Sequence, residues 1–361
     1  MILYIFLIIA TLLPALISIL FNKRPNASMN NSSVNNRKGE NLWFIIILFI
    51  LWLLTAFRSE NIGNDTQAYI SCFKYIANNG ISDLIYMEKG YQALCYLISL
   101  FTKDPHIFLI TVATITYTLL GLYIHKYSKN SLISSLLVLC ICFSPLTNVL
   151  RQGLAMVLCL YVYEWFKEKK YIKAALLLLV AMSLHVTAIA LLLVALYKIL
   201  PRKPRTVFIA STILLLLSIT GGLTNTFIRL FPQYNDYFYG ARVGSGLLAI
   251  TVGIARSALL YYYAYINEKD KNVKTPRMAI FVLILFFNCL GTAMNLLTRV
   301  SEYFLFISVS ELPNIYMGTN RDKTTRVLMA AICILYALYF ITVLTIRPDW
   351  NNLYPYSFWS S

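Results

Sequence analysis

The chain has 361 residues, of which 59% are apolar and only 13% are charged. A soluble globular protein carries roughly 25% charged residues, so this composition excludes a soluble enzyme, a disordered chain and a fibrous protein. The net charge is +16, with 31 lysine and arginine residues against 15 aspartate and glutamate residues. In a soluble protein this charge suggests nucleic acid, whereas in a membrane protein it records topology. We therefore expect a membrane protein with no nucleic-acid partner.

Apolar blocks long enough to cross a bilayer recur along the chain, which also excludes a single-span anchor. In chain order they cover residues 1–22, 41–57, 106–125, 131–147, 149–166, 174–199, 207–222, 247–266, 278–297, 300–317 and 328–346. The first block has no basic segment before it, so we expect a retained helix rather than a cleaved signal peptide. These blocks predict one all-α integral membrane domain over residues 1–361, with about 10–13 transmembrane or half-membrane helices.

The charges between the blocks predict the topology, because lysine- and arginine-rich loops stay in the cytoplasm. Residues 23–40 are then a cytoplasmic loop, whereas residues 58–105, 223–246 and the tail 347–361 are external. Within the first external loop, the apolar stretch 89–102 is too short to span a bilayer. It predicts a re-entrant or interfacial helix.

The block 174–199 predicts a break in the chain. It is long enough for one span, yet basic residues flank both of its ends. A hairpin of two half-length helices, bent near residues 183–185, keeps both flanks in the cytoplasm, and broken helices are tolerated where they line a cavity. The bend lies beside His185, whose neutral imidazole can accept a proton. A hydrogen-bonded core histidine is the alternative interpretation.

Several outer cations are arginines within or beside apolar segments. A planar guanidinium suits bidentate binding of phosphate, whereas snorkelling of a helix-end arginine to the interface is the alternative. These residues are Arg58, Arg151, Arg229, Arg242, Arg299 and Arg347. Their convergence on one external cavity would suit a pyrophosphate.

Two of these arginines have polar neighbours at helical spacing. Asn148, Arg151 and Gln152 are expected to share a helix face at the external start of a span, where a helix N-terminus favours anions. A second polar stripe consists of Asn288, Thr292, Asn295, Arg299 and Glu302. This stripe predicts a water-lined cavity or a bundle interior, although it crosses a predicted break near residue 298. For the group around Arg151 the alternative is a capped helix start. For the stripe around Arg299 the alternative is an Arg299–Glu302 ion pair that only ties helices together.

The segment after the second block predicts a turn and a new helix. Gly63 and Asn64 are typical of a turn, and Asp65-Thr66 is typical of a helix N-cap. Capping accounts for Asp65, which is also placed to orient an arginine or a sugar hydroxyl.

The seven cysteines have no paired metal-ligand spacing and an odd count. They support neither a metal site nor a disulfide framework, and we expect no metal or other cofactor.

Together these segments resemble the EpsG-like family of Wzy-type polysaccharide polymerases over nearly the whole chain. Each motif is short, and their order and spacing carry the resemblance. The motifs are Arg58…Gly63-Asn64-Asp65-Thr66…Tyr69, Asn148…Arg151-Gln152, the basic loop through Lys170 followed by His185, Arg299…Glu302-Tyr303 before Leu312-Pro313, and Asn352…Tyr354-Pro355-Tyr356.

The resemblance implies a membrane glycosyltransferase of GT-C-like architecture in the bacterial cytoplasmic (inner) membrane. It would transfer a growing glycan from undecaprenyl pyrophosphate to a repeat unit on another lipid carrier, at the outer face and without a metal. Its partners would be the undecaprenyl-pyrophosphate-linked donor and acceptor, membrane lipids, a chain-length regulator and a flippase. The product would be a capsule, O-antigen or exopolysaccharide.

The resemblance also implies roles for site residues. Arg151 and Arg299, with Arg58 or Arg242, would bind the pyrophosphate, and His185 would activate the acceptor hydroxyl with inversion at the anomeric carbon. Asp65 and Glu302 would orient these groups. The remaining substrate-binding candidates are Asn148, Gln152, Asn295 and Tyr303.

Two other functions stay open at this point. A flippase or transporter for a lipid-linked glycan would also use arginine for pyrophosphate, but it needs polar access from both sides in alternation. The unexplained polar residues here gather toward the outer half. A non-catalytic subunit of a polysaccharide assembly complex would tolerate neutral replacement of His185 and Arg299.

Overall fold

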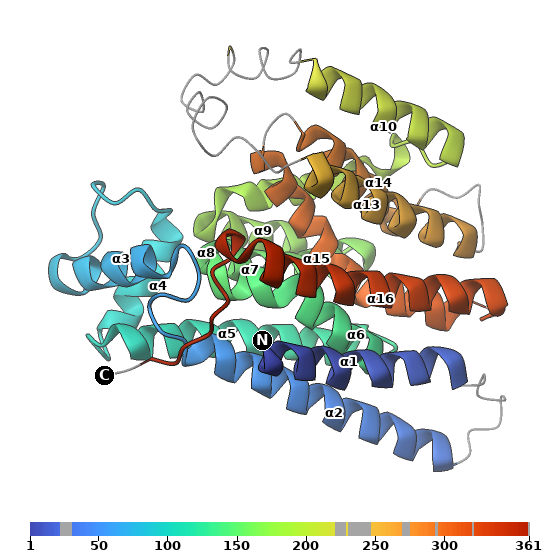
Figure 1. The fold of residues 1–361 in the computed structure, drawn as a ribbon. Coiled ribbons are helices and arrows are strands. Elements are labelled where there is room, and N and C mark those ends of the chain that lie inside the picture. The colour runs from blue at the N-terminus through green and yellow to red at the C-terminus, as the bar shows by residue number, and fades with distance from the viewer. Residues whose placement is uncertain are drawn as a thin grey trace. The chain divides into compact units, whose positions relative to one another are not determined.

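The computed structural model describes residues 1–21, 31–220, 229, 247–268, 275–292, 295–319 and 321–359. The regular elements within these ranges are all helices (Figure 1). Five helical segments among them are long and apolar enough to cross a membrane: Ile2–Phe21, Gly39–Ala56, Pro105–Tyr127, Ser131–Asn148 and Lys323–Ile346. The predicted all-α, multi-pass membrane protein is thereby confirmed.

The chain divides into two compact units, residues 1–189 with 322–361 and residues 190–321. The assignment of the whole chain to one membrane domain stays a prediction. The predicted external loop 223–246 lies outside the described residues except for residue 229, and so do residues 23–30 of the predicted loop 23–40. Residues 31–40 of that predicted loop are helical.

The first unit is built around long apolar helices. They are α1 (Ile2–Phe21), α2 (Asn31–Ala56), α5 (Pro105–Tyr127), α6 (Ser131–Leu137) and α16 (Lys323–Ile346). Helix α1 packs against α6 and α16, and α2 packs against α5 and α6 (Figure 1). Each helix buries one face, as Leu7 and Ala15 do on α1, while Ile9 and Leu13 of the same helix remain exposed. Such exposed apolar side chains suit contact with lipid.

The chain is interrupted several times after α6. A π-helical turn, Val138–Cys142, leads to α7 (Phe143–Asn148), and a break at Val149 precedes α8 (Leu150–Lys167). Helix α9 (Tyr171–Leu184) packs along α8 and ends at His185, whose backbone is extended. A 3-10 helix, Val186–Lys198, follows. The predicted break at residues 183–185 is therefore confirmed, whereas the reversal of the chain into a hairpin stays a prediction.

Two short helices lie between α2 and α5. Helix α3 (Thr66–Asn79) packs on α4 (Lys89–Ser99), and α4 also contacts α5 and α9. Helix α4 has 11 residues, which corresponds to only about 16 Å of rise. The predicted short element is thus a helix that cannot cross a bilayer, and its re-entrant or interfacial placement stays a prediction.

The predicted tail folds back onto the loop between α2 and α3. The Gly63 amide donates to the Asn352 carbonyl at 3.0 Å, and the Trp359 amide donates to the Phe57 carbonyl at 2.9 Å. The Trp359 ring stacks on His106 with centroids 4.7 Å apart. Residues 347–359 are therefore a packed part of the first unit.

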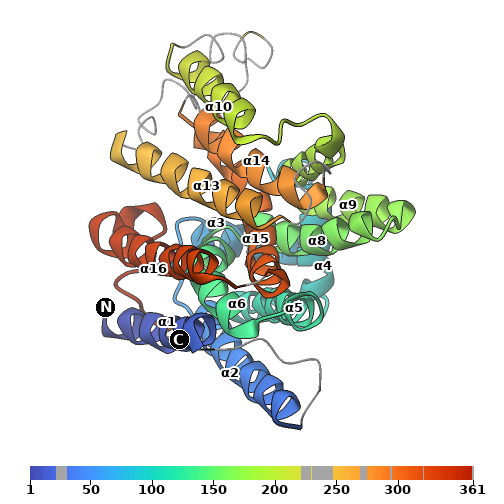
Figure 2. The same cartoon turned by 90° about the vertical axis from the view of Figure 1, so that its right-hand side faces the viewer.

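The second unit contains α10 (Pro204–Ile219), α13 (Leu247–Asn267), α14 (Pro276–Leu290) and α15 (Asn295–Gly318). Helix α14 packs against the other three (Figure 2). Thr275 caps α14, because its hydroxyl accepts from the Met278 amide at 3.3 Å. Pro276 occupies the first turn, where its missing N–H costs nothing.

The predicted break near residue 298 is wrong. Helix α14 ends at Leu290 and α15 begins at Asn295, so Arg299 lies inside α15. A Cβ on Gly291 would lie 2.2 Å from the Thr298 side chain, so glycine permits this tight connection. The polar stripe is consequently divided between two helices, and Asn288 donates to Ser301 at 3.3 Å across them.

Candidate functional site

Three side chains from different segments of the first unit meet at one carboxylate. Glu88 precedes α4, Arg151 lies in the first turn of α8, and His185 follows α9. Glu88 Oε1 lies 2.8 Å from His185 Nδ1, and Glu88 Oε2 pairs with Arg151 Nη1. The three side chains are only 19–21% exposed. The structure thus joins two predicted site residues through a glutamate.

Glu88 is not among the predicted site residues, and it falls within the predicted external loop 58–105. Its partners are 63 and 97 residues away in the chain, so no local pattern reports them. The available signal was an acidic residue immediately before a short amphipathic helix. Such a residue is more often an N-cap, but the Glu88 side chain makes no capping bond.

Glycine allows this cluster to form. A Cβ on Gly90 would lie 2.6 Å from the Ser183 carbonyl oxygen and equally close to the Ser183 Cβ. Any larger residue at this position would push α4 away from the end of α9. The close approach brings Glu88 to His185 and lets the Val186 amide donate to Glu88 Oε1 at 3.2 Å.

Two tyrosine rings lie against the Arg151 guanidinium. The Arg151 Cζ lies 5.9 Å from the Tyr69 ring centroid and 5.8 Å from that of Tyr91. Both rings are buried, and their centroids are 5.7 Å apart. Cation–π contacts of this kind favour a fixed guanidinium without neutralising its charge.

The surroundings of Glu88 keep it ionised. Burial raises the pKa of its carboxyl. The hydrogen bond from His185 and the charge of Arg151 lower this pKa by more than burial raises it, and the result is a pKa of about 2. At neutral pH the carboxylate is therefore an acceptor only, and each neighbouring group must donate to it.

Asp65 lies at the N-cap position of α3 as predicted, but its carboxylate makes no capping hydrogen bond. Its backbone has φ −101° and ψ 0°, which is the helical rather than the extended region that directs an N-cap side chain at the helix amides. The Asp65 amide instead donates to Asn148 Oδ1 at 3.3 Å. The predicted turn is present, since Gly63 has φ +85°.

Asn148 does not share a helix face with Arg151. It ends α7, and the break at Val149 separates it from α8. Val149 occupies the N-cap of α8 and makes no side-chain cap, so the alternative of a capped helix start is also wrong. Asn148 contacts the loop before α3 and the tail instead, and it donates to Asn351 Oδ1 at 3.4 Å. Gln152 is buried, with 2% of its surface exposed.

Arg58 is fully buried. Its Nε donates to Thr66 Oγ1 at 3.3 Å, and its Nη1 donates to the Thr55 carbonyl. Burial lowers the pKa of this guanidinium to about 10, so it stays charged at neutral pH. Arg58 thereby ties the end of α2 to the start of α3, and its contact with substrate stays a prediction.

The other predicted site residues belong to the second unit or lie outside the description. On α15, Arg299 is exposed, Glu302 is half-buried and Tyr303 is fully buried. Arg242 and the side chain of Asn295 are outside the described residues. That these residues belong to the same site as Glu88, Arg151 and His185 stays a prediction.

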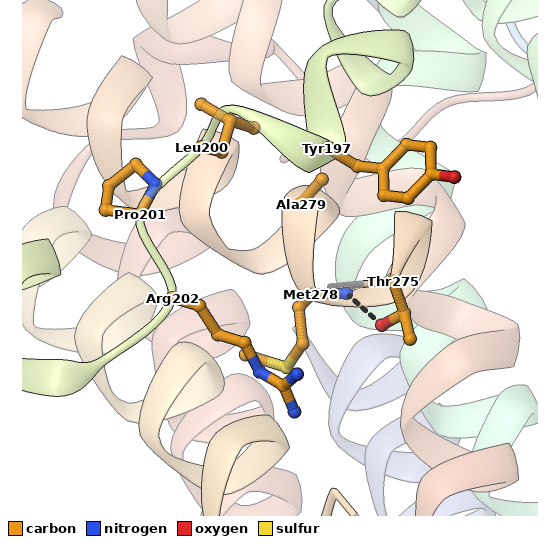
Figure 3. Close-up of a pocket in the computed structure, with 7 residues that line it drawn as sticks. All are labelled: Tyr197, Leu200, Pro201, Arg202, Thr275, Met278 and Ala279. Atoms are coloured by element: carbon orange, nitrogen blue, oxygen red, sulfur yellow. Dashed lines mark hydrogen bonds between the residues drawn. The ribbon is translucent and has the colours of Figure 1, made fainter. Parts of the chain in front are cut away.

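A small pocket in the second unit contains none of the predicted site residues (Figure 3). It is lined by Tyr197, Leu200, Pro201, Arg202, Thr275, Met278 and Ala279. Within the described ranges, no three His, Cys, Asp or Glu residues are grouped closely enough to hold a metal ion.

Comparison with known proteins identifies one match. A family model described as the EpsG family matches residues 41–358, which is most of the chain and includes Glu88, Arg151 and His185. No curated protein and no solved structure matches the chain.

Proposed function

The chain belongs to the EpsG family, and we propose that it is a membrane glycosyltransferase that polymerises undecaprenyl-pyrophosphate-linked glycan repeat units. The observation that carries the proposal is the pairing of an anion-binding group and a proton acceptor around one carboxylate. Arg151 supplies the cation and His185 supplies the imidazole, and both side chains are largely buried.

Arg151 is suited to the donor pyrophosphate. Its planar guanidinium can hold two phosphate oxygens at once. It lies in the first turn of α8, an 18-residue helix, whose N-terminal amides favour an anion at the same place. Arg151 would stabilise the negative charge that develops on the leaving pyrophosphate.

His185 is suited to the acceptor sugar. Its imidazole accepts the proton of the acceptor hydroxyl as that oxygen bonds to the anomeric carbon of the donor glycan. The bond from the anomeric carbon to the pyrophosphate oxygen breaks, and its electron pair leaves with undecaprenyl pyrophosphate. Attack from the face opposite the leaving group gives inversion at that carbon. The protonated imidazole then releases its proton to solvent.

The distribution of charge in the first unit supports an outer-face site. At the end of the first unit opposite Glu88, α1 bonds to the residue before α6 and to the start of α16. Asn130 donates to Ser18 Oγ, and Arg326 donates to the Leu20 carbonyl. The following basic residues lie at that opposite end: Lys126, Lys129, Lys167, Lys169, Lys170, Lys173, Lys323 and Arg326. Segments at the Glu88 end carry acidic and basic residues in near balance. By the positive-inside rule the basic end is cytoplasmic, which favours a site open to the outside of a bacterial cytoplasmic membrane.

The remaining candidates complete the proposal. We assign Arg299 a second contact with pyrophosphate, and Asp65 and Glu302 the orientation of the reacting groups. The flippase and the non-catalytic subunit are the alternatives, and neither needs a proton acceptor at His185.

The test uses purified protein with undecaprenyl-pyrophosphate-linked repeat units. We expect the wild type to make longer lipid-linked chains, and Arg151→Ala and His185→Ala to lower the rate about 100-fold or more. Matched controls are Arg205→Ala and His125→Ala, since both side chains are exposed and should leave the rate unchanged.

The outcomes separate the alternatives. Chain growth that persists in Arg151→Ala and His185→Ala would refute the site. No growth by the wild type, together with transfer of the lipid between leaflets of a vesicle, would favour the flippase.

A further inference from the structure

The two oxygens of the Glu88 carboxylate have different partners. Oε1 receives hydrogen bonds from His185 Nδ1 at 2.8 Å and from the Val186 amide at 3.2 Å. Oε2 pairs with Arg151. The contact with Arg151 can therefore be lost while the contact with His185 is kept.

The Oε1 side determines which ring nitrogen of His185 accepts a proton. Because the carboxylate already accepts from Val186 and Arg151, it is ionised and His185 Nδ1 must donate to it. Nε2 is then the proton acceptor of the neutral ring. A carboxylate on Nδ1 also stabilises the imidazolium that forms when Nε2 takes a proton, as in other base–orienter pairs.

The Oε2 side neutralises Arg151 when no substrate is bound. The two tyrosine rings that contact the guanidinium carry no charge, so Glu88 is the anion that pairs with it. The Arg151 side chain is 19% exposed, so part of it remains open to a ligand oxygen. A pyrophosphate that binds Arg151 replaces one anion by another.

We infer that Glu88 is a positioning residue with two separable tasks: it holds His185 as the proton acceptor throughout, and it is the counter-ion of Arg151 until the lipid pyrophosphate takes its place. This inference rests on the proposed function. Glu88 therefore opposes substrate binding and favours the chemical step, and this combination distinguishes it from a residue that only stabilises the fold.

The experiment compares Glu88→Gln with wild type in steady-state polymerisation and in binding of undecaprenyl pyrophosphate. The glutamine keeps the size of the side chain and removes the charge. We expect kcat to fall at least tenfold, because the imidazolium loses its partner. We expect KM for the donor and the Kd for undecaprenyl pyrophosphate to fall by roughly tenfold, because Arg151 loses its competing anion.

Two further variants make the test specific. Glu88→Asp restores the charge, so it should return Kd toward the wild-type value and recover part of kcat. Glu60→Gln is the matched control, since it removes one exposed charge from the same end of the unit and should change neither constant.

Two results would overturn the inference. One is a Glu88→Gln variant with wild-type kcat. The other is a Glu88→Gln variant whose kcat falls while its Kd for undecaprenyl pyrophosphate is unchanged or weaker. A wild type that elongates no glycan would refute the polymerase proposal alone, because tighter binding of undecaprenyl pyrophosphate by Glu88→Gln would still support the counter-ion task.

Discussion

Replacement of Gly90 by alanine tests whether the contact between α4 and α9 builds the site. The added Cβ would lie 2.6 Å from the Ser183 carbonyl oxygen, whereas ordinary contact begins at 3.4 Å. The Ser183 hydroxyl can rotate away, but the carbonyl belongs to the backbone of α9. The two helices must therefore separate by about 0.8 Å at this point.

A separation of this size is enough to break the hydrogen bond between Glu88 and His185. The distance from Glu88 Oε1 to His185 Nδ1 is 2.8 Å, and a displacement along it would lengthen the contact to about 3.6 Å, which is no longer a hydrogen bond. Overpacking of this kind costs about 1–3 kcal/mol of unfolding free energy. Misplacement of a reacting group by about 1 Å costs up to 100-fold in rate.

The assay measures thermal unfolding and glycan elongation on the same purified samples. Gly90→Ala should unfold at a lower temperature than wild type and lose tenfold or more in kcat. Gly39→Ala is the matched control, because a Cβ there meets nothing within 4 Å and alanine favours the helix.

Equal behaviour of the two glycine variants would refute the reasoning. If Gly90→Ala unfolded at the wild-type temperature and kept the wild-type kcat, α4 and α9 would not be in the contact described.

Three further predictions concern stability. Gly63→Ala should lower the free energy of unfolding by about 2 kcal/mol in denaturant titration, because φ is +85° and the Cβ would lie 3.1 Å from the Thr147 carbonyl; an unchanged midpoint would contradict this. The Glu88 pKa falls from 4.5 to about 2 on folding, so its stabilisation is complete above pH 4.5 and is lost as the pH falls toward 2. The unfolding temperature of wild type should therefore fall more steeply below pH 4.5 than that of Glu88→Gln, and parallel curves would disprove the pairing. Glu311 is fully buried and pairs with Arg277 at 2.6 Å, so Arg277→Met should cost about 3 kcal/mol by removing the cation that pairs with this buried carboxylate. Adding Glu311→Gln should recover most of that cost, and no recovery would contradict the pairing.

The helices were predictable because their signal is local. A bilayer demands long apolar stretches, and polar residues bound the blocks 1–22, 106–125 and 328–346 close to the observed ends of α1, α5 and α16. The break at His185 followed from charge alone, since basic residues flank both ends of the block 174–199. The family resemblance followed from short motifs whose order spans nearly the whole chain, and the family match over residues 41–358 confirms it.

The connection between α14 and α15 shows where local reasoning failed. Polar residues continue at helical spacing through this region, from Asn288 to Arg299, so the position of the turn depends on which backbone can approach its neighbour closely. Gly291 permits that approach, and its lack of a side chain was the available signal.

The sequence by itself determined that this chain is an all-α, multi-pass membrane protein of the EpsG family, because span length, charge and motif order are properties of consecutive residues. Only the tertiary structure decided that Glu88 meets Arg151 and His185, that Gly90 makes room for this, and that the tail packs on the Gly63 turn. The physical reason is distance along the chain. These contacts join residues from 63 to 289 positions apart, and they exist only when separate helices pack.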